Sequence, residues 1–537
     1  MSLDSRVRRP LLPARVLWQQ NAENAELLCC NDIGQARAGA FPCCTLPPGA
    51  SILLDFGREL HGGLQLVSGP TKGNQTANLR LRFGESASEA MGNPNNDHAL
   101  HDFEIALPPM AAQEYGLSGF RFARLDSLET ELELPLVAAR AMTLMRPLEP
   151  IGSFSCNDER LNRIWQVGAD TVALCMQDFL WDGPKRDRLV WMGDLHPEIA
   201  VVSAVWGAHE IVPQSLDWVR DTTPLPAWMN GIGSYSLWWI IIQRDWFHAH
   251  GDGQYLEKQR EYLLGLLPLL IDQIGANGDV EWRGMRFLDW PSSAQPEAVD
   301  AGLVALLAMA LEAAREICEL WGQSEAQESC REALSRLRAA PPAIPAQSKQ
   351  ASSLLALTNL APAAQINTEV LAREPLSGLS TFYGYYVLQA RALAGDYAGA
   401  FEVIRHYWGG MLDLGATSFW EHFELSWAQN AARIDEIPSE NQRDIHRDCG
   451  EYCYQGYRHS LCHGWAAGPT AWLSQHVLGV EILEAGAKRV RIAPQLGDLE
   501  WARGTLPTPH GPLHVMHRRV GSEIETEFEA PPGIEVV

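Results

Sequence analysis

The chain has 537 residues, of which 46% are hydrophobic and 20% charged, so it is long enough for two to four domains around a large core. Its formal net charge of −24 argues against a nucleic-acid or anionic-membrane partner, because both need a positive field. The N-terminus has no apolar stretch of signal-peptide length, and no run of about 18 apolar residues suggests a membrane span. The cysteines number 11, which is odd, and most have apolar neighbours, so reduced thiols in a cytoplasmic protein are expected.

Residues 1–150 carry short runs of alternating polar and apolar residues, bounded by Gly, Pro, Asn and Ser. LRLRF and FRFARL show the period of two most clearly, and the polar stretch 91–102 is expected to be a long loop. Antiparallel strands with one buried face produce this pattern. We therefore expect an N-terminal antiparallel β-sandwich domain over residues 1–150.

Residues 151–478 are dominated by the helical period of 3.6, which replaces the period of two near Ser153–Asn157. Asn157 is a candidate N-cap for the first helix. About twelve helices with short connections predict an (α/α)6 barrel, and a helical solenoid is the competing arrangement, although no repeat of fixed length is evident. The expected helices lie at 157–179, 195–207, 214–222, 235–251, 254–274, 299–322, 324–338, 353–360, 382–395, 397–412, 419–429 and 465–479.

Residues 479–537 return to strand patterns in GVEILEAGAKRVRIAPQL, LEWARGTLPTPHGPLHVMHRRV and EIETEFEA. A β domain this small would be marginal alone, so we expect it to pack on the barrel. The predicted fold class is a multidomain α+β protein. A central (α/α)6 barrel over 151–478 would be flanked by the N-terminal sandwich and a small C-terminal β-sandwich domain over 479–537.

The most informative segment is D-G-P-K-R-D-R-L-V-W-M-G-D, residues 182–194. Asp182, Asp187 and Asp194 lie within thirteen residues, between an Asp-Gly-Pro turn and the start of an expected helix. Loops held by a scaffold are where catalytic groups concentrate. The structural alternative is a salt-bridged surface loop in which these acids pair with neighbouring bases. Those bases are Lys185, Arg186 and Arg188.

A second acid–aromatic junction is G-A-T-S-F-W-E, residues 415–421. Glu421 follows Trp420 at what looks like a helix start, where free N–H groups would favour the charged carboxylate. The plain alternative is an acid that only complements the helix dipole. Further junctions, each of which alone would fit ordinary packing, occur at Trp290, at Tyr383 and at His463.

Metal and phosphate chemistry are not favoured by the motifs. Cys449, Cys453 and Cys462-His463 lack the paired spacing of a zinc site, and Gly231-Ile232-Gly233 leads into no phosphate-binding loop. No serine nucleophile elbow is present either. Acids and aromatic rings that gather at one end of a barrel therefore favour glycoside chemistry, which needs two carboxyls and a surface for a sugar ring.

These motifs resemble the bacterial α-L-rhamnosidases, glycoside hydrolase family 78, over nearly the whole chain. The resemblance rests on DGPKRDRLVWMGD, GATSFWE and LCHGWAAGPT, with ILLDFGRELHGGLQL and GDLEWARGTLPTPHGPL in the flanking β regions. It implies an (α/α)6 barrel that removes terminal α-L-rhamnose from small rhamnosides with inversion. No metal or cofactor is expected, and a homodimer is a reasonable expectation.

The resemblance also assigns roles. Asp187 would be the general acid and Glu421 the general base. Many family members have Cys at the position of Gly183 and Glu at that of Asp187, so the acid in this chain has a shorter reach. Residues expected to bind or shape the site around rhamnose are Asp182, Arg186, Trp191, Asp194, Trp290, Tyr383, Trp420 and His463.

Two alternatives remain open at this point. Another inverting glycosidase on the same barrel, similar to a fucosidase or a glucoamylase, would use the same two carboxylates. A non-catalytic carbohydrate-binding protein would keep the barrel and bind rhamnose without hydrolysis. The two acids expected of a catalyst, Asp187 and Glu421, argue for an enzyme.

Overall fold

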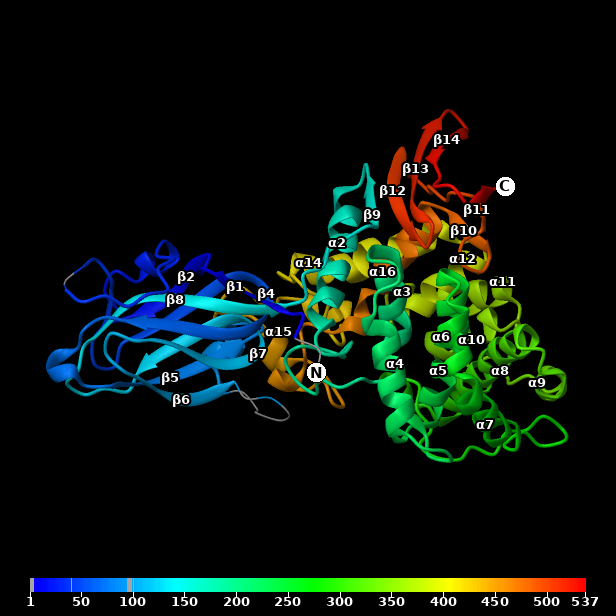
Figure 1. Ribbon diagram of the computed structural model, residues 1–537, viewed down its shortest axis with the longest axis horizontal. Helices are drawn as coiled ribbons and strands as arrows, with labels where there is room; N and C mark the ends of the chain where they lie inside the picture. Colours follow the sequence, from blue (N-terminus) through cyan, green and yellow to red (C-terminus); the bar gives the residue numbers. More distant parts are fainter. Residues whose placement is uncertain (1–3, 40, 94–98, 100) are drawn as a thin grey trace. The chain divides into compact units, whose positions relative to one another are not determined.

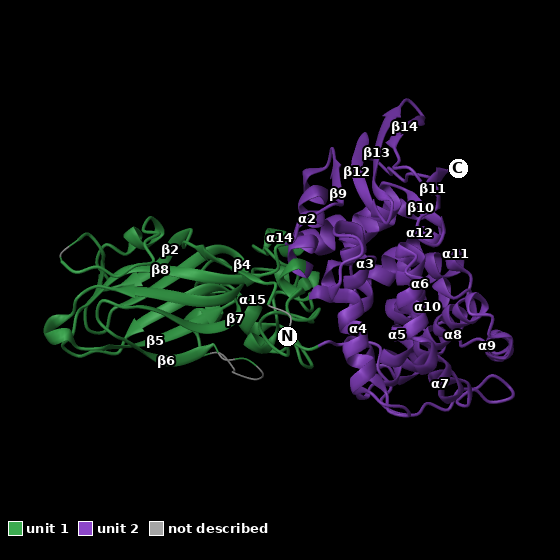
Figure 2. Cartoon of the chain, viewed as in Figure 1, with its two compact units in different colours: residues 1–147, 173–189, 410–463 green, residues 148–172, 190–409, 464–537 purple. Residues whose placement is uncertain are grey.

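The computed structural model describes residues 4–39, 41–93, 99 and 101–537. The chain forms two compact units, coloured separately in Figure 2. Unit 1 comprises residues 1–147, 173–189 and 410–463, and unit 2 comprises 148–172, 190–409 and 464–537. Both units are therefore built from segments that lie far apart in the sequence.

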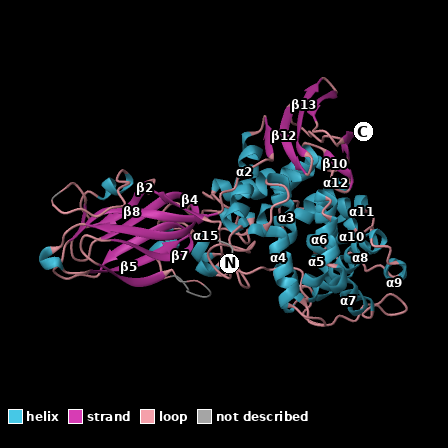
Figure 3. Ribbon diagram, in the orientation of Figure 1, coloured by secondary structure: helices cyan, strands magenta, loops and turns pink. Residues whose placement is uncertain are grey.

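Unit 1 contains an antiparallel sheet of eight strands, as expected from the alternating pattern of the N-terminal region (Figures 1 and 3). The strand order is β1-β8-β4-β7-β5-β6, while β2 pairs with β4 and β3 with β8. The strands are β1 (Val7–Leu11), β2 (Arg15–Gln20), β3 (Cys44–Leu46), β4 (Ser51–Ser68), β5 (Ala77–Gly84), β6 (Asp102–Leu107), β7 (Ala112–Ser127) and β8 (Leu134–Met145).

The period of two in β5 arises because alternate side chains point to the same face of the strand. Those on the inner face all belong to one hydrophobic core: Ala77, Leu79, Leu81 and Phe83. The expected loop at 91–102 includes residues 94–98 and 100, which lie outside the described residues. It is preceded by a short helix, α1 (Ala87–Met91), which the strand pattern did not predict.

Strand β4 is interrupted by a bulge that turns an acid inward. Its pairing with β7 shifts register between Asp55 and Leu60, and Gly57 in this stretch has a φ of 80°, which favours glycine. Glu59, within the same interruption, is buried. The bulge thus places a carboxyl group inside unit 1.

Unit 2 is largely helical, as expected. Six of its helices form a closed cycle of contacts, α3–α5–α8–α10–α12–α16 and back to α3. These six are α3 (Leu195–Val205), α5 (Gly233–His250), α8 (Pro296–Leu320), α10 (Lys349–Leu357), α12 (Gly384–Leu393) and α16 (Gly468–Trp472). Other helices are α2 (Glu159–Cys175), α4 (Ile211–Thr222), α6 (Gly253–Lys258), α7 (Arg260–Ile271), α9 (Ser324–Ala339), α11 (Ala363–Ile366) and α13 (Tyr397–Val403).

Two small sheets complete unit 2. One has the order β10-β11-β15 and the other β14-β13-β12-β9. Strand β9 joins the C-terminal strands although it precedes the first long helix in the sequence. The strands are β9 (Ser153–Cys156), β10 (Val480–Glu484), β11 (Arg489–Ile492), β12 (Trp501–Thr508), β13 (Gly511–Val520), β14 (Glu523–Glu529) and β15 (Glu535–Val536).

Two local predictions are wrong. The cap of α2 is Asp158, whose Oδ1 accepts from the N–H groups of Arg160 and Leu161, while Asn157 accepts from Glu500 and Trp501 instead. The stretch 419–429 is not an α-helix, because a 3-10 helix, Leu425–Ala428, is all that forms there. Glu421 therefore lies in a loop and its carboxylate needs partners other than a helix dipole.

Candidate active site

The segment 182–189 of unit 1 is an irregular loop, as its composition predicted, and it is closed by reciprocal bonds between its ends. The Asp182 N–H donates to the Leu189 carbonyl at 3.1 Å, and the Leu189 N–H donates to Asp182 Oδ1 at 2.9 Å. The loop lies against β7, where a Cβ on Gly119 would come within 2.7 Å of the Lys185 nitrogen. Glycine is needed at position 119 because the loop backbone passes so close.

Backbone strain is concentrated in the same loop. Asp187 and Arg188 are consecutive non-glycine residues with φ of 55° and 53°. This left-handed region costs free energy for an arginine, so surrounding contacts must hold it. Arg188 Nη2 donates to the Leu117 carbonyl of β7 at 2.9 Å. Strain that is maintained in this way is common at functional sites.

Arg186 connects the two acids that the sequence singled out. Its Nη2 donates to Glu421 Oε1 at 2.6 Å and also to Oε2, and its Nη1 lies 3.2 Å from Asp187 Oδ1. Because both nitrogens belong to one rigid planar guanidinium, the contacted oxygens of Asp187 and Glu421 are no more than roughly 8 Å apart. Two carboxyls distant in sequence thus share one cation inside unit 1.

The loop that carries Glu421 is fixed by pairing with the segment that precedes His463. The Glu421 N–H donates to the Ser460 carbonyl at 3.0 Å, and the Ser460 N–H donates back to Glu421 Oε2 at 3.2 Å. The His463 N–H donates to the Phe419 carbonyl at 2.9 Å. Main-chain donors and Arg186 therefore replace the helix start that the sequence pattern had suggested as the partner of the Glu421 carboxylate.

His463 lies between two of the acids. Its Nε2 is 3.7 Å from Glu421 Oε1 and 3.9 Å from Asp182 Oδ2. Burial lowers the pKa of His463 to about 4, so the imidazole is neutral near neutral pH. As predicted, His463 stands immediately before a helical turn, the 3-10 helix at Gly464–Ala467.

The surroundings favour the neutral form of Asp182 but the charged form of Arg186. Burial, and then the nearby Asp187 carboxylate, raise the pKa of Asp182 well above its ordinary value. The Glu421 and Asp187 carboxylates hold the pKa of Arg186 above its usual value although burial opposes the charge. The structure thus favours a neutral Asp182 beside an ionised Arg186.

Gly183 stands where a larger residue would collide. A Cβ at this position would lie 2.7 Å from the Cys462 carbonyl oxygen, a main-chain atom next to His463. This close approach explains physically why the chain has glycine there.

The other predicted site residues divide between the units. Trp420 belongs to unit 1 and is buried. Trp191, Asp194, Trp290 and Tyr383 belong to unit 2. Burial, and then Asp289, raise the pKa of Tyr383 well above its ordinary value.

Sequence patterns missed a buried group of charges beside this site, formed by Glu85, Glu89, Lys185 and His446. In the described part of the chain, Glu85, Glu89 and His446 have ligand-type atoms close enough to hold a metal ion. However, Lys185 Nζ lies 3.1 Å from Glu85 Oε2 and 3.0 Å from Glu89 Oε1, so an ammonium already provides the cation that these carboxylates contact. A Ser-x-x-Glu pattern, Ser86 to Glu89, was the available signal, because it typifies a capped helix start.

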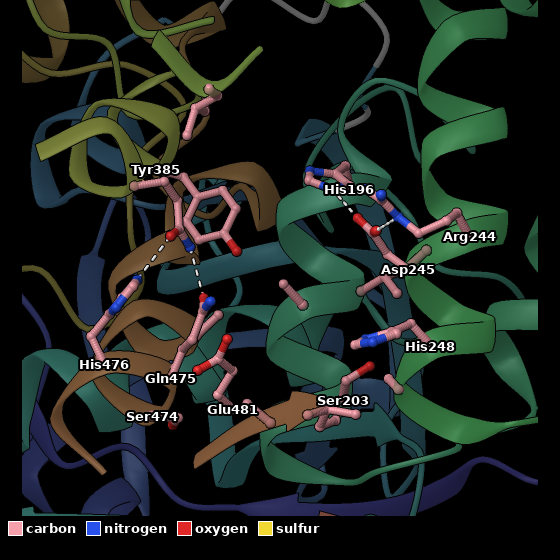
Figure 4. Close-up of a pocket in the computed structure, with 18 of the residues that line it drawn as sticks. His196, Ser203, Arg244, Asp245, His248, Tyr385, Ser474, Gln475, His476 and Glu481 are labelled. Atoms are coloured by element: carbon pink, nitrogen blue, oxygen red, sulfur yellow. Dashed lines mark hydrogen bonds and ion pairs between the residues drawn. The ribbon is translucent and has the colours of Figure 1, made fainter. Parts of the chain in front are cut away.

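A cavity of about 1060 Å³ lies in unit 2, lined by residues of α3, α5, α8, α10 and α12 (Figure 4). Its polar side chains pair with one another. His196 Nε2 is 3.0 Å from Asp245 Oδ2, Ser203 Oγ is 3.0 Å from His250 Nε2, and His476 Nε2 is 2.9 Å from Gln389 Oε1. The cavity contains none of the predicted site residues.

Comparison with known proteins identifies the family. Residues 149–367 match the bacterial α-L-rhamnosidase six-hairpin glycosidase domain, and residues 479–537 match the bacterial α-L-rhamnosidase C-terminal domain. The chain belongs to the bacterial α-L-rhamnosidase family. The first match contains the 182–194 motif and Trp290, whereas Glu421 and His463 lie outside both matches.

Solved rhamnosidases share the fold. The family 78 rhamnosidase of Bacillus sp. GL1 is 23% identical with a TM-score of 0.75, over 95% of this chain and 55% of that one. The Klebsiella oxytoca rhamnosidase with rhamnose bound is 21% identical with a TM-score of 0.70, over 88% of this chain and 96% of that one. The shared architecture is an N-terminal antiparallel sheet, a helical middle and C-terminal sheets.

A curated relative, the α-L-rhamnosidase of Formosa agariphila, is 24% identical over 152 residues, which cover 27% of this chain and 16% of that protein. This chain therefore matches only a small part of the curated relative and about half of the Bacillus enzyme. Among the described residues, none of the helices combines the length and apolar character needed to cross a membrane.

Proposed function

We propose that this protein is an α-L-rhamnosidase that removes terminal α-L-rhamnose from small rhamnosides with inversion. The observation that carries the proposal is the Asp187–Arg186–Glu421 bridge, which joins two acids from distant parts of the sequence in a strained, buried loop. Family membership supports the choice of rhamnose as the sugar. Inverting glycosidases need two carboxyls roughly 6.5–9.5 Å apart, and the bridge is compatible with that range.

Asp187 acts as the general acid in this proposal and protonates the leaving glycosidic oxygen. Its side chain is partly exposed, whereas that of Asp182 is buried. Asp187 is therefore the more accessible of the two to a glycosidic oxygen. The water oxygen bonds to the anomeric carbon as the bond from that carbon to the glycosidic oxygen breaks. Asp187, which must be protonated when substrate binds, gives its proton to the leaving oxygen and so completes the leaving alcohol.

Glu421 acts as the general base and takes a proton from the attacking water. The base must be ionised, and Arg186 and the Ser460 N–H both stabilise its carboxylate. Asp182, kept neutral, offers both a donor and an acceptor to a sugar hydroxyl. A neutral His463 beside it adds polar atoms without adding charge.

In unit 2 we propose that Asp194 binds a rhamnose hydroxyl and that Trp191, Trp290 and Tyr383 shape the pocket for the sugar. We propose that Trp420 in unit 1 supports Glu421 by packing.

The closed cycle of six helices in unit 2 supports the proposal that these helices are the inner ring of an (α/α)6 barrel. We also propose domain boundaries near residues 150 and 478, a β-sandwich fold for each of the two terminal domains, and a homodimer. The cysteines of the chain are free thiols, which is consistent with a cytoplasmic location.

The proposal is tested with nitrophenyl α-L-rhamnoside, with the matching fucoside and glucoside as competitors. We expect nitrophenol release from the rhamnoside, with Asp187→Asn and Glu421→Gln each lowering kcat by at least about 10³-fold while the protein stays folded. Proton NMR of the fresh product should show the inverted anomer. Preference for another glycoside would indicate a different glycosidase, and rhamnose binding without hydrolysis would indicate a carbohydrate-binding protein.

A further inference from the structure

The two neighbouring cations of the catalytic loop point to different partners. Arg186 contacts Glu421 and Asp187, whereas Lys185 contacts Glu85 and Glu89. Lys185, Glu85 and Glu89 are each no more than 1% exposed, so none of the three charges is hydrated by bulk water. Buried charges are retained only when they are paired and hydrogen-bonded, and this group is.

Lys185 also holds the segment 457–461 through its main chain. Its Nζ lies 2.8 Å from the Tyr457 carbonyl and 2.8 Å from the His459 carbonyl. Between these two residues, the Arg458 carbonyl accepts from Arg186 Nε at 2.7 Å. Three consecutive carbonyls are thus shared between the two cations, and they alternate between the Lys185 group and the Arg186 group.

The same alternation continues into the Glu421 contacts. The Ser460 N–H donates to Glu421, and the next N–H, that of Leu461, donates to Glu85 Oε2. Ser460 Oγ donates to Glu85 Oε1 at 3.2 Å. The segment 457–461 therefore lies between two charged groups. Some of its main-chain atoms bond to the buried Glu85–Lys185–Glu89 group, and the others bond to the Arg186–Glu421 pair.

The Glu85–Lys185–Glu89 group is held together by hydrogen bonds and by its opposite charges. Glu89 lies in the first turn of α1, and its Oε2 accepts from the Glu85 N–H at 2.7 Å. The Glu85 and Glu89 carboxylates hold the pKa of Lys185 above its ordinary value although burial opposes the charge. Burial, and then the Glu85 charge, raise the pKa of the adjacent Glu59, which favours a neutral carboxyl there.

We propose that Lys185, held by Glu85 and Glu89, is a positioning residue that fixes the geometry of Arg186 and Glu421 through the segment 457–461. This inference rests on the proposed function for its kinetic consequence but not for its geometric one. Displacement of catalytic groups by about 1 Å can cost about 10²-fold in rate. Lys185 therefore acts on kcat without touching substrate.

The test is the paired variant Lys185→Met/Glu89→Gln, which removes one positive and one negative charge and so avoids leaving both carboxylates buried without a cation. We expect kcat on the aryl rhamnoside to fall about 10- to 100-fold while KM stays within about twofold. If this variant fails to fold, Glu89→Gln alone is measured, with a smaller expected loss of kcat in the same direction. The matched control is Asp126→Asn, which breaks the Arg82–Asp126 bridge of the same unit.

The control should lower the melting temperature without lowering kcat. A paired variant that behaves like the control, with kcat unchanged, overturns the inference. A crystal structure of the paired variant tests the geometry independently of activity, and we expect the Arg186–Glu421 contact to be displaced. If that contact is unchanged, the inference is wrong whatever the kinetics. An inactive wild type with a displaced contact in the variant would reject the proposed function and keep the positioning role.

Discussion

The acidic site of unit 1 and the cavity of unit 2 differ in how their polar groups are paired. In unit 1, Asp187 and Glu421 both contact Arg186, while burial and then the Asp187 charge raise the pKa of Asp182. In unit 2, burial opposes the charge of the cavity acid Asp245, but Arg244 and His196 lower its pKa to about 2, so this acid is paired and ionised. Shared charges and strained backbone indicate a site better than volume does, because perturbed pKa values and maintained backbone strain both cluster at functional sites.

The largest expected effect on stability comes from Arg186→Met, which removes the cation that the two acids share. Glu421 is 4% exposed and would lose both contacts to the guanidinium, so we expect unfolding free energy to fall by about 3–5 kcal/mol. We expect kcat to fall at least about 10²-fold. Urea unfolding and steady-state kinetics provide the two measurements.

Arg186→Lys is the control for this change. Lysine keeps the positive charge but lacks the planar fork that reaches Glu421 and Asp187 together, so its kcat should lie between those of the wild type and the methionine variant. Wild-type kcat in both variants would show that unit 1 does not depend on the shared cation, and the contrast with the cavity would disappear.

The sequence predicted the elements of both regions better than their contacts. The period of two in β5 and the helical period of α8 were sufficient, because burial of one face determines each pattern. The irregular character of 182–194 was also evident from its composition. These features depend on residues that are close together in the sequence, so a sequence pattern can predict them.

Contacts between distant segments could not be predicted. Glu421 was expected at a helix start, but it lies in a loop whose N–H group at Glu421 donates to the Ser460 carbonyl, a main-chain bond that almost any residue type could make. Lys185 looked like a partner for nearby aspartates, whereas its partners are Glu85 and Glu89, about a hundred residues earlier. No periodicity encodes such pairings, since they follow from how the loop packs on the sheet.

Asp182→Asn tests whether Asp182 is protonated in the folded protein, through the pH dependence of stability. An unfolded chain ionises this aspartate near 3.8, whereas burial and then Asp187 raise its pKa in the folded protein. Between these two values the folded protein keeps a proton that the unfolded chain has lost, so stability falls as pH rises. Each unit of pKa difference corresponds to about 1.4 kcal/mol.

Asparagine has no such proton, so the variant should lose less stability than the wild type between pH 4 and pH 8. Other acids with raised pKa values, including Glu59, contribute equally to both proteins, and the difference between the two curves isolates Asp182. Urea unfolding at a series of pH values measures it. Parallel curves would mean that Asp182 is ionised in the folded protein and that unit 1 has no protonated acid at this position.

The smallest effect is expected from Gln389→Ala in the cavity of unit 2. Gln389 contacts His476 and Gln475, which themselves line the cavity, so its loss disturbs local pairing without altering any group that the proposed reaction uses. We expect kcat and KM for the aryl rhamnoside to stay within about twofold and unfolding free energy to fall by about 1 kcal/mol. A tenfold loss of kcat would place the cavity in the catalytic machinery, and pairing of polar groups would then no longer distinguish the two regions.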